Sequence, residues 1–266
     1  MAIQRIDTGG FVMNAELSGP AGAPVVCLNH CFAADHGYWD AHLPALEGFR
    51  VLRYDTRGHG DSDAPPGPYT LEMLADDVAR LCDVLGVDRV HFCGVSLGGQ
   101  IAQTFALNHP QRVASLTIVN STCEYSAEQA QQWRARAELA QRGGMQAVHD
   151  ALLARWFTDE AAQRKIPGYR YMDAVLRRFT ADSFSAASEA MCGLDTTARL
   201  AQIAVPSMVV ATSDDPGASP EVSRKMARLI PDCELHWLEP ASHLASLEHP
   251  ERFNDLLRSF LKKQLS

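Results

Sequence analysis

The hydrophobic and polar positions of this chain follow two alternating patterns over most of its length. Short apolar runs of about four to eight residues predict buried strands, and longer stretches with apolar positions three and four residues apart predict helices. The predicted strands are residues 2–6, 11–17, 25–29, 50–54, 89–93, 115–119, 207–211 and 234–238. The predicted helices are residues 38–46, 71–85, 97–109, 220–229 and 251–265. This alternation predicts an α/β fold whose mostly parallel sheet has helices on both faces.

One long stretch, residues 122–197, departs from this alternation because it contains no strand pattern. Ser126 and Gln129 have the spacing of a capping box, which predicts a helix that ends at Arg142, before two glycines. Further helices are predicted at residues 145–157, from residue 158 onward, and at 181–192. We expect residues 122–197 to form a helical cap, inserted into a core made of residues 1–121 and 198–266, and not an independent domain.

Composition narrows the classes of partner. A length of 266 residues suits one large α/β domain, and 46% hydrophobic and 21% charged residues are ordinary for a globular protein. The formal net charge is −8, whereas nucleic acids and anionic membranes attract basic surfaces. We therefore expect neither nucleic acid nor a membrane as a partner. The oligomeric state is left open.

The cysteines and the first residues of the chain indicate in which cellular compartment the protein is expected. The seven cysteines contain no CxxC pair and are odd in number, which favours free thiols in a reducing environment. The first residues lack the apolar stretch of a signal peptide, and no run of about 18 apolar residues occurs. These features predict a cytoplasmic protein.

The chemistry of the chain is expected at Gly94-Val95-Ser96-Leu97-Gly98, a GxSxG sequence between a predicted strand and a predicted helix. A tight strand-to-helix turn forces its central residue into a strained backbone and exposes its side chain. Small residues are needed at Gly94 and Gly98, where a Cβ would collide with the adjoining elements. Ser96 is therefore the candidate nucleophile. A chance GxSxG in a glycine-rich turn is the alternative, and the partners of Ser96 must decide.

A serine hydroxyl needs a base and an acid that orients the base. Of the ten histidines, His243 follows the last predicted strand in a short loop of small residues. Asp214 and Asp215 follow the strand at 207–211, at the same edge of a parallel sheet. Asn120 stands after the sixth predicted strand and cannot carry the acid's charge. The other histidines considered are His30 and His59, in loops at that edge, and His91 and His236, inside strands and expected to be structural.

An acyl-transfer site also needs donors for the oxyanion. The backbone N–H of Leu97, at the start of the nucleophile helix, is one candidate. The loop after the strand at 25–29 reads His30-Cys31-Phe32-Ala33, and the N–H of Phe32 is the other.

The motifs GVSLGG, DTRGHGDS, SDDP and PASHLASLEHPERF, in this order, make the chain resemble an α/β-hydrolase over nearly its full length. The resemblance implies an eight-stranded, mostly parallel sheet and the nucleophile, acid, base order Ser96, Asp215, His243. It also favours Asp215 over Asp214, because the residue just before proline is the usual acid. One position departs from the family: Cys31 follows His30 where many members have glycine, which puts the conformation of this loop in question.

Within the superfamily the chain is most similar to 3-oxoadipate enol-lactonases, which also lack His-Gly in the oxyanion loop. The likeness extends to the predicted cap through Trp133, Arg136, Gly144-Met145 and the run from Arg155 to Thr158. These lactonases act on a carboxylate-bearing lactone, so a cap arginine would suit an anionic substrate. Trp133, Arg136 and Trp156 are therefore possible substrate-binding residues. Helix packing, or a solvated face for Arg136, is the alternative explanation.

The sequence as a whole predicts a serine hydrolase, without cofactor or metal, that cleaves a small ester or lactone through an acyl-enzyme. Histidine side chains in general titrate near about pH 6.5, so activity is expected to fall on the acid side. Carbon–carbon bond hydrolases, perhydrolases and general carboxylesterases use the same residues and stay open. A ligand-binding protein that keeps the fold without turnover is a more remote alternative.

Overall fold

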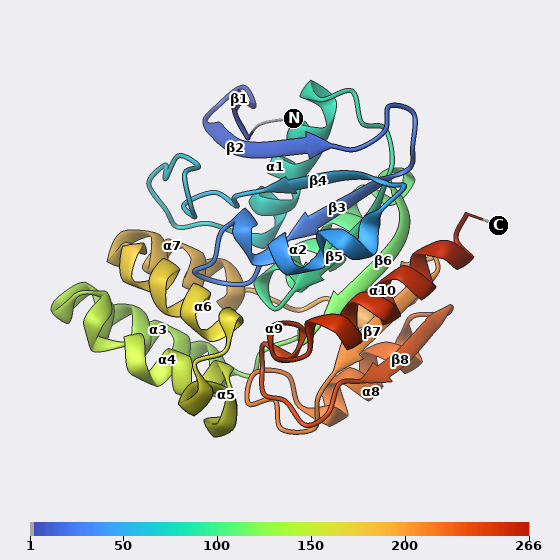
Figure 1. The fold of residues 1–266 in the computed structure, drawn as a ribbon. Coiled ribbons are helices and arrows are strands. Elements are labelled where there is room, and N and C mark those ends of the chain that lie inside the picture. The colour runs from blue at the N-terminus through green and yellow to red at the C-terminus, as the bar shows by residue number, and fades with distance from the viewer. Residues whose placement is uncertain (1–2, 266) are drawn as a thin grey trace.

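The computed structural model describes residues 3–265 as an eight-stranded sheet with helices around it (Figure 1). The strands are β1 (Gln4–Asp7), β2 (Val12–Ser18), β3 (Val25–Asn29), β4 (Arg50–Tyr54), β5 (Val90–Val95), β6 (Val113–Val119), β7 (Ser207–Ala211) and β8 (Cys233–Trp237). Their order in the sheet is β1-β2-β4-β3-β5-β6-β7-β8. The expected α/β fold with an eight-stranded sheet is confirmed.

Strand direction determines where loops gather. β1 and β2 pair antiparallel, and β2 pairs antiparallel with β4, whereas every pair from β4 through β8 is parallel. The six strands from β4 to β8 in the sheet therefore end at one edge, and ligands bind at this edge in open α/β sheets. β5 lies inside this parallel part and is buried at all six positions, which explains its continuous apolar run.

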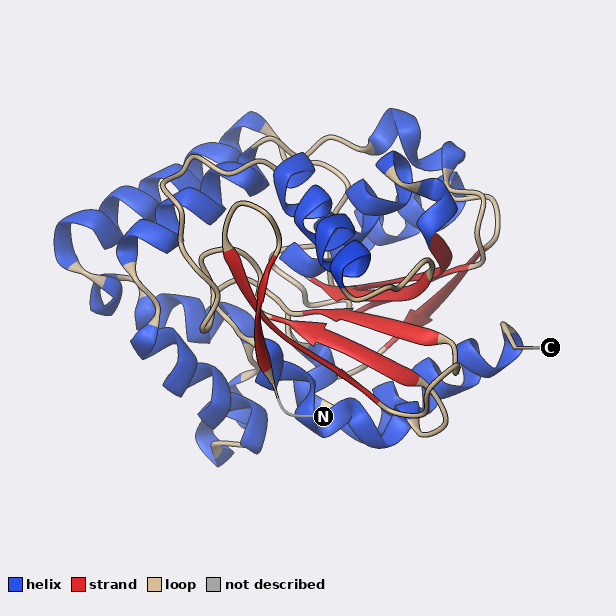
Figure 2. Ribbon diagram, turned by 90° about the horizontal axis from the view of Figure 1, so that it is seen from above, coloured by secondary structure: helices blue, strands red, loops and turns tan. Residues whose placement is uncertain are grey.

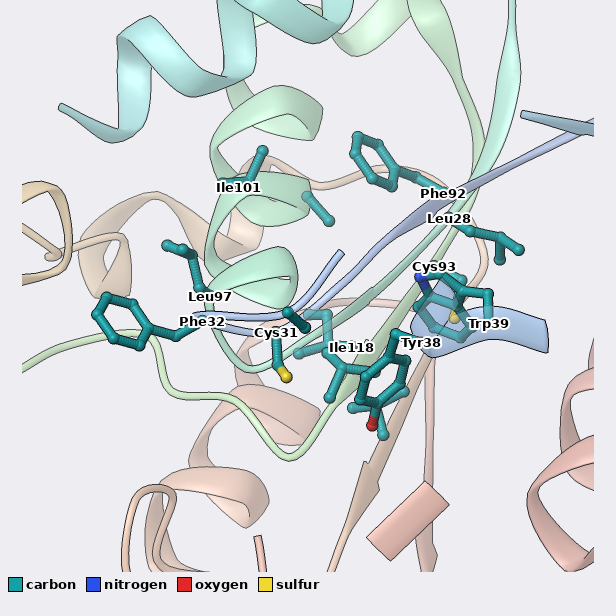
Figure 3. Close-up of a cluster of buried hydrophobic side chains, with 14 of the residues drawn as sticks. Leu28, Cys31, Phe32, Tyr38, Trp39, Phe92, Cys93, Leu97, Ile101 and Ile118 are labelled. Atoms are coloured by element: carbon teal, nitrogen blue, oxygen red, sulfur yellow. The ribbon is translucent and has the colours of Figure 1, made fainter. Parts of the chain in front are cut away.

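Helices cover both faces of the sheet, as Figure 2 shows. Those outside the long insertion are η1 (His36–Leu46), α1 (Leu71–Val84), α2 (Leu97–Asn108), η2 (Pro110–Arg112), η4 (Thr197–Gln202), α8 (Pro220–Leu229), α9 (Ala245–Glu248) and α10 (Pro250–Lys263). α1 packs beside α2, and α10 packs on η1. Large buried side chains such as Phe92, Leu28 and Trp39 fill the space between sheet and helices (Figure 3).

The stretch between β6 and β7 is helical, as its pattern predicts. It contains α3 (Ala127–Gly143), η3 (Met145–Ala147), α4 (His149–Trp156), α5 (Asp159–Arg164), α6 (Pro167–Arg178) and α7 (Ala181–Cys192), which lie together beside the sheet in Figure 1. The predicted capping box of Ser126 and Gln129 is formed. At the base, the chain entering the stretch pairs with the chain leaving it through a bridge between Glu124 and Asp195.

Several element boundaries differ from the sequence prediction. The helix expected at 145–157 is two elements, because the backbone at Val148 (φ −117°, ψ −13°) separates η3 from α4. α6 was not predicted at all, although Pro167 stands at its first position, where proline favours a helix start. The segment at 38–46 is a 3₁₀ helix that begins at His36 and contains Pro44. Strand and helix ends elsewhere shift by one or two residues. Ala2, placed in the first predicted strand, lies outside the described residues.

Candidate active site

Ser96 stands at the sharp turn between β5 and α2. Its backbone has φ 54° and ψ −114°, a conformation that L residues rarely adopt, as expected for a strained turn. The N–H of Ser96 donates to the Val119 carbonyl at 2.9 Å, and the Ser121 hydroxyl donates to the Ser96 carbonyl at 2.8 Å. These contacts hold the backbone of the turn to β6 and the loop after it.

The two flanking glycines are required by space. A Cβ on Gly94 would lie 2.1 Å from the Gly98 carbonyl oxygen, and one on Gly98 would lie 2.3 Å from the Asn29 carbonyl oxygen. Both distances are far inside van der Waals contact with backbone atoms that cannot swing away. The sequence interpretation of Gly94 and Gly98 is thus confirmed.

A hydrogen-bonded chain connects Ser96, His243 and Asp215, which three separate loops bring together. Nε2 of His243 lies 2.8 Å from the Ser96 Oγ, and Nδ1 of His243 lies 2.8 Å from Oδ1 of Asp215. All three residues are buried. Because a protonated Nδ1 donates to the carboxylate, Nε2 is left to accept from the serine hydroxyl. This is the geometry that converts a serine into a nucleophile.

Asp215 is held as a carboxylate by its surroundings. Its Oδ1 also accepts from the N–H groups of Gly217 and Ala218, and its Oδ2 accepts from the Asn120 amide at 3.0 Å. Burial opposes its ionisation, but the charge on His243 and these hydrogen bonds outweigh burial and keep the pKa of Asp215 below its usual range. Asp215, not Asp214, therefore faces His243. Asn120 takes a supporting role that the sequence did not suggest.

Of the two expected oxyanion donors, Phe32 lines the pocket beside Ser96, and Leu97 directly follows Ser96. Leu97 begins α2, and the N–H groups of Leu97 and Phe32 have no acceptor within residues 3–265. Figure 3 shows Phe32 and Leu97 at the same end of the buried cluster. Cys31 does not have a positive φ, whereas Ala33 has φ 58°. The loop therefore needs no glycine at position 31, which answers the question raised by that departure from the family.

His30 and His59 do not contact Ser96 and serve the loops instead. Nδ1 of His30 donates to the Cys31 carbonyl, and its Nε2 accepts from the Thr56 N–H at 3.0 Å, so its ring connects the loops after β3 and β4. Burial lowers the pKa of His30, and it lowers the pKa of His59 to about 3. Both rings are thus neutral at ordinary pH.

The pocket next to Ser96 is small. It has a volume of ≈ 10 Å³, which is room for about one water molecule. Its lining residues are Cys31, Phe32, Ser96, Tyr125, Trp133, Arg155, Trp156, Gly217 and His243.

Comparisons with known proteins show the family of this chain. The family model described as alpha/beta hydrolase fold matches residues 24–250. The chain belongs to the α/β-hydrolase family. It is 31% identical to 3-oxoadipate enol-lactonase 1 of Acinetobacter baylyi over 95% of this chain and 94% of that protein. The fold and these relatives make this α/β-hydrolase an enzyme of the class that hydrolyses esters and lactones.

Two solved structures are similar to this α/β-hydrolase over almost their whole length. The enol-lactonase from Burkholderia xenovorans LB400 has a TM-score of 0.93 at 32% identity, covering 97% of this chain and 100% of the other. A thermophilic esterase from Thermogutta terrifontis, described with malate bound, has a TM-score of 0.89 at 30% identity, covering 99% and 98%. The resemblance to enol-lactonases inferred from the sequence is confirmed.

The helices after β6 contribute to the pocket of this α/β-hydrolase, but not with the expected arginine. Trp133 and Trp156 line the pocket, whereas Arg136 does not line it and stacks on the Trp133 ring, with its guanidinium carbon 5.1 Å from the ring centroid. Arg155 lines the pocket instead. Burial and the nearby charge of Arg155 lower the pKa of Arg136, so the two cations lie close to each other. Arg155 belongs to the run from Arg155 to Thr158 that carries the likeness to enol-lactonases, but the sequence analysis selected Arg136 and Trp156 as substrate-binding residues.

Tyr125 is a second lining residue that the sequence reasoning missed. It follows β6 by six positions, and its hydroxyl accepts from the Gln100 amide at 3.0 Å. Gln100 is one helical turn after Ser96, and its N–H donates to the Ser96 carbonyl. Tyr125 is therefore held against the first turn of α2 through Gln100.

The loop carrying His243 is tied to the end of α4 by hydrogen bonds. The Ser242 hydroxyl donates to the Arg155 carbonyl at 3.1 Å, and the Leu244 N–H donates to the Trp156 carbonyl at 3.0 Å. Glu248 strengthens this connection, because its carboxylate accepts from the Ser242 N–H and also from the N–H and hydroxyl of Thr158, the N-cap of α5. The elements that line one wall of the pocket thus also hold the loop of His243.

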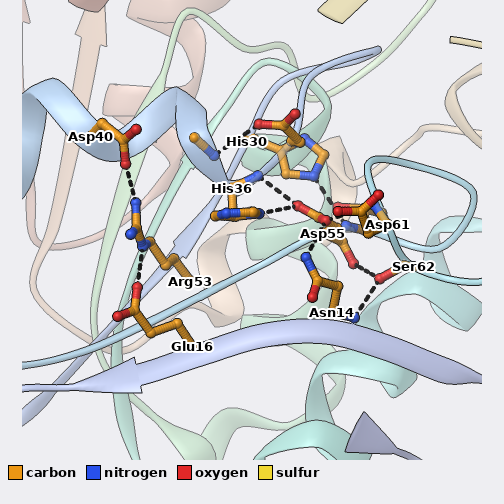
Figure 4. Close-up of polar contacts among 12 residues, drawn as sticks. Asn14, Glu16, His30, His36, Asp40, Arg53, Asp55, Asp61 and Ser62 are labelled. Carbon is orange, nitrogen blue, oxygen red and sulfur yellow. Dashed lines mark hydrogen bonds and ion pairs between the residues drawn. The ribbon is translucent and has the colours of Figure 1, made fainter. Parts of the chain in front are cut away.

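Asp35, His36 and Asp55 form a cluster that the sequence did not reveal, with potential ligand atoms within 4.8 Å of one another. The carboxylate of Asp55, however, already accepts several hydrogen bonds from the protein. It accepts from the His36 N–H and ring and from the Asn14 amide, and the Asp61 N–H donates to it as well (Figure 4). We interpret the cluster as a brace for the loop after β4.

Two further predictions from the sequence concern the cysteines and membrane-spanning helices. All seven cysteines are unpaired, in line with free thiols. Within residues 3–265, no helix is both long and apolar enough to cross a membrane.

Proposed function

We propose that this protein is a serine hydrolase that cleaves a small, carboxylate-bearing ester or lactone through an acyl-enzyme, with residues 122–197 acting as a cap over the site. The observation that carries the proposal is the continuous hydrogen-bonded chain from Ser96 Oγ through His243 to Asp215. No cofactor or metal is needed for this chemistry, because nucleophile, base and oxyanion donors all belong to the protein.

In the proposed acylation, Ser96 Oγ attacks the acyl carbon while His243 Nε2 takes the hydroxyl proton. The carbonyl oxygen becomes an oxyanion, which the N–H groups of Leu97 and Phe32 stabilise. The tetrahedral intermediate then collapses, the bond to the leaving oxygen breaks, and that oxygen receives the proton from Nε2. Asp215 stabilises the imidazolium that exists between the two proton transfers.

Deacylation repeats the sequence with water. His243 takes a proton from water as its oxygen attacks the acyl carbon, and the proton passes to Ser96 Oγ when the ester bond to the enzyme breaks. The products are a carboxylic acid and an alcohol, or a single hydroxy or keto acid when the substrate is a lactone.

Positive charge at the pocket supports an anionic substrate. Arg155 lines the pocket and Arg136 lies close behind it, in an otherwise aromatic surrounding that strengthens a charge–charge contact. An arginine fork suits a planar carboxylate. Similarity to an enol-lactonase and to an esterase described with malate bound points the same way.

The decisive test is turnover of p-nitrophenyl acetate and of a carboxylated enol-lactone by wild type and by Ser96→Ala. We expect wild type to hydrolyse both, with the lactone preferred, and Ser96→Ala to lose at least about 10³-fold in kcat. Equal rates in the two proteins would refute the serine mechanism. A preference for the neutral ester would leave a general carboxylesterase, and cleavage of a 1,3-diketone alone would indicate a carbon–carbon bond hydrolase.

A further inference from the structure

The space beside Ser96 is too small for the proposed substrates, whereas a larger cavity lies nearby. The inner pocket measures ≈ 10 Å³, and an outer cavity of ≈ 370 Å³ lies between the loops after β3 and β4 and the helices α6 and α7. The outer cavity is lined by Ala33, Ala34, Asp35, Gly58, Gly60, Asp61, Ser62, Ala64, Val175, Arg178, Phe179, Thr180 and Ser183. Neither Ser96 nor His243 borders it.

Aromatic rings separate the two spaces. Phe32 lines the inner pocket, Phe179 lines the outer cavity, and their ring centroids are 5.8 Å apart. Phe184 packs edge-on against Phe32 at 4.8 Å, and Trp133 contacts Phe32 at 5.2 Å from the inner side. The partition is therefore about two rings thick. Ala33, the residue after Phe32, already belongs to the outer wall.

A substrate can enter the inner pocket only if part of its wall moves, and a side chain moves most easily into space that is empty. Close packing blocks the rings directed into the core, because protein interiors leave few voids larger than a water molecule. The Phe32–Phe179 partition is different, since open volume lies on its outer side.

We propose that the outer cavity is a second part of the substrate site, which receives a neutral substituent of the ester or lactone once the Phe32–Phe179 partition opens, so that these rings limit substrate size. This inference rests on the proposed function. Its chemistry follows from the lining: Asp35 is paired with Arg178 at 3.2 Å, and Asp61 adds a further carboxylate. An anionic group would be repelled there, whereas alanines, Phe179 and hydroxyls suit a neutral chain.

The first experiment uses Phe179→Ala, which removes the ring on the outer side of the partition. Phe179, the C-cap of α6, is only half-buried, so the variant should fold, and Tyr169→Ala, at a half-buried position within α6, controls for general disturbance of this helix. The readout is kcat/KM for p-nitrophenyl esters from acetate to octanoate and for acetate esters of longer alcohols. Phe179→Ala should raise the long-chain to acetate ratio about ten-fold in one series, and Tyr169→Ala should not.

The second experiment fills the cavity. Ala64→Trp places a large ring at its exposed mouth, and Ala21→Trp puts the same ring in the exposed turn between β2 and β3. Ala64→Trp should lower kcat/KM for long-chain esters about ten-fold while Ala21→Trp leaves it unchanged.

Chain-length profiles of Phe179→Ala and Ala64→Trp that both coincide with wild type, in folded proteins, would overturn the inference. Such a result is distinct from failure of the proposed function, because Ser96→Ala would still abolish turnover of the acetate ester. If wild type has no Ser96-dependent turnover of any ester, the proposed function fails and this inference fails with it.

Discussion

At the scale of single residues, the site depends on positions where no other side chain fits. Ser96 has an unfavourable backbone conformation. The tight turn that imposes it is possible because Gly94 and Gly98 have no Cβ, so that β5, α2 and the end of β3 at Asn29 can approach closely. The strain is local, and the surrounding packing compensates for it.

Gly98→Ala tests this arrangement. The new Cβ would lie 2.3 Å from the Asn29 carbonyl oxygen, so α2 must shift, and we expect a loss of about 3 kcal/mol or more in the free energy of unfolding. Urea denaturation measures it. Gly86→Ala, a glycine with open space around it, controls for helix-end effects, although its φ of +64° still costs about 1 kcal/mol. Equal losses in the two variants would show that the close approach is unimportant.

The adjacent aspartates provide a matched pair. Asp215→Asn should lower kcat by about 10⁴-fold, because the amide cannot hold the required tautomer or stabilise the imidazolium. Asp214→Asn should change kcat less than about two-fold, since Asp215 is the one of these two aspartates that bonds to His243. Steady-state kinetics of both variants on p-nitrophenyl acetate measure the two effects. A large loss of kcat in Asp214→Asn would contradict the assignment of Asp215 as the acid.

Arg155 and Arg136 form a second pair. Arg155→Met should reduce kcat/KM for a carboxylated lactone by about 10²-fold relative to a neutral ester, a loss of about 3 kcal/mol typical of a charged hydrogen bond. Arg136→Met should have a smaller effect because Arg136 does not line the pocket. The ratio between the two substrates is the readout, because the Arg155 side chain also contacts the Pro216 carbonyl. An unchanged ratio in Arg155→Met would contradict a carboxylate site.

Residues of the site differ in how far the sequence could predict them. Ser96, Asp215 and His243 each follow a strand in a recognisable motif, so topology alone brings them to one edge. Arg155 could not be chosen over Arg136, because both lie on helices whose rotation is set by tertiary packing. Helical periodicity does not specify which face meets the sheet.

At the scale of elements, α4, α5 and the loop of His243 form one connected unit. Glu248, on α9, accepts hydrogen bonds from Ser242 beside His243 and from Thr158 at the start of α5. The loop of His243 and the start of α5 are therefore held by one shared carboxylate.

Glu248→Ala should disturb both the loop of His243 and the start of α5. Three donors would lose a charged acceptor, so we expect about 2 kcal/mol lower stability and about ten-fold lower kcat. Thermal denaturation and ester hydrolysis measure the two effects, with the exposed Glu251→Ala as control. Reduced stability with unchanged kcat would show that the carboxylate supports the fold but does not position His243.

Element prediction succeeded where a pattern was long and regular. β5, α2 and the strands around them were found to within one or two residues, since buried parallel strands have continuous apolar runs. α6 was missed, and 145–157 was joined into one helix, because the breaks there depend on single backbone angles and not on hydrophobic spacing.

At the scale of the whole molecule, buried neutral histidines make stability depend on pH. Burial lowers the pKa of His42 to about 4 and that of His59 to about 3. Below the unfolded value of about 6.5, the unfolded chain binds protons that the native protein does not, so stability falls as pH falls. The loss continues until the folded pKa of each group is reached.

We expect the free energy of unfolding to drop by about 3 kcal/mol between pH 6.5 and 5, at about 1.4 kcal/mol per pH unit and histidine. Urea denaturation across this range tests it, and His42→Asn should reduce the slope by about 1.4 kcal/mol per pH unit. A slope unchanged in His42→Asn would contradict a buried neutral His42. Burial is the largest cause of both pKa shifts, and sequence patterns do not report how deeply a histidine is buried.

The hydrogen bonds from Ser242 and Leu244 to the carbonyls that end α4 have a consequence for engineering. A chimaera that receives residues 122–197 from a relative would also receive that relative's version of the helix end that accepts hydrogen bonds from the loop of His243. The transplant would succeed only if the stretch from Ser242 to Glu248 travelled with it. In this enzyme, new substrate preference would thus be acquired by exchanging two distant segments of sequence together.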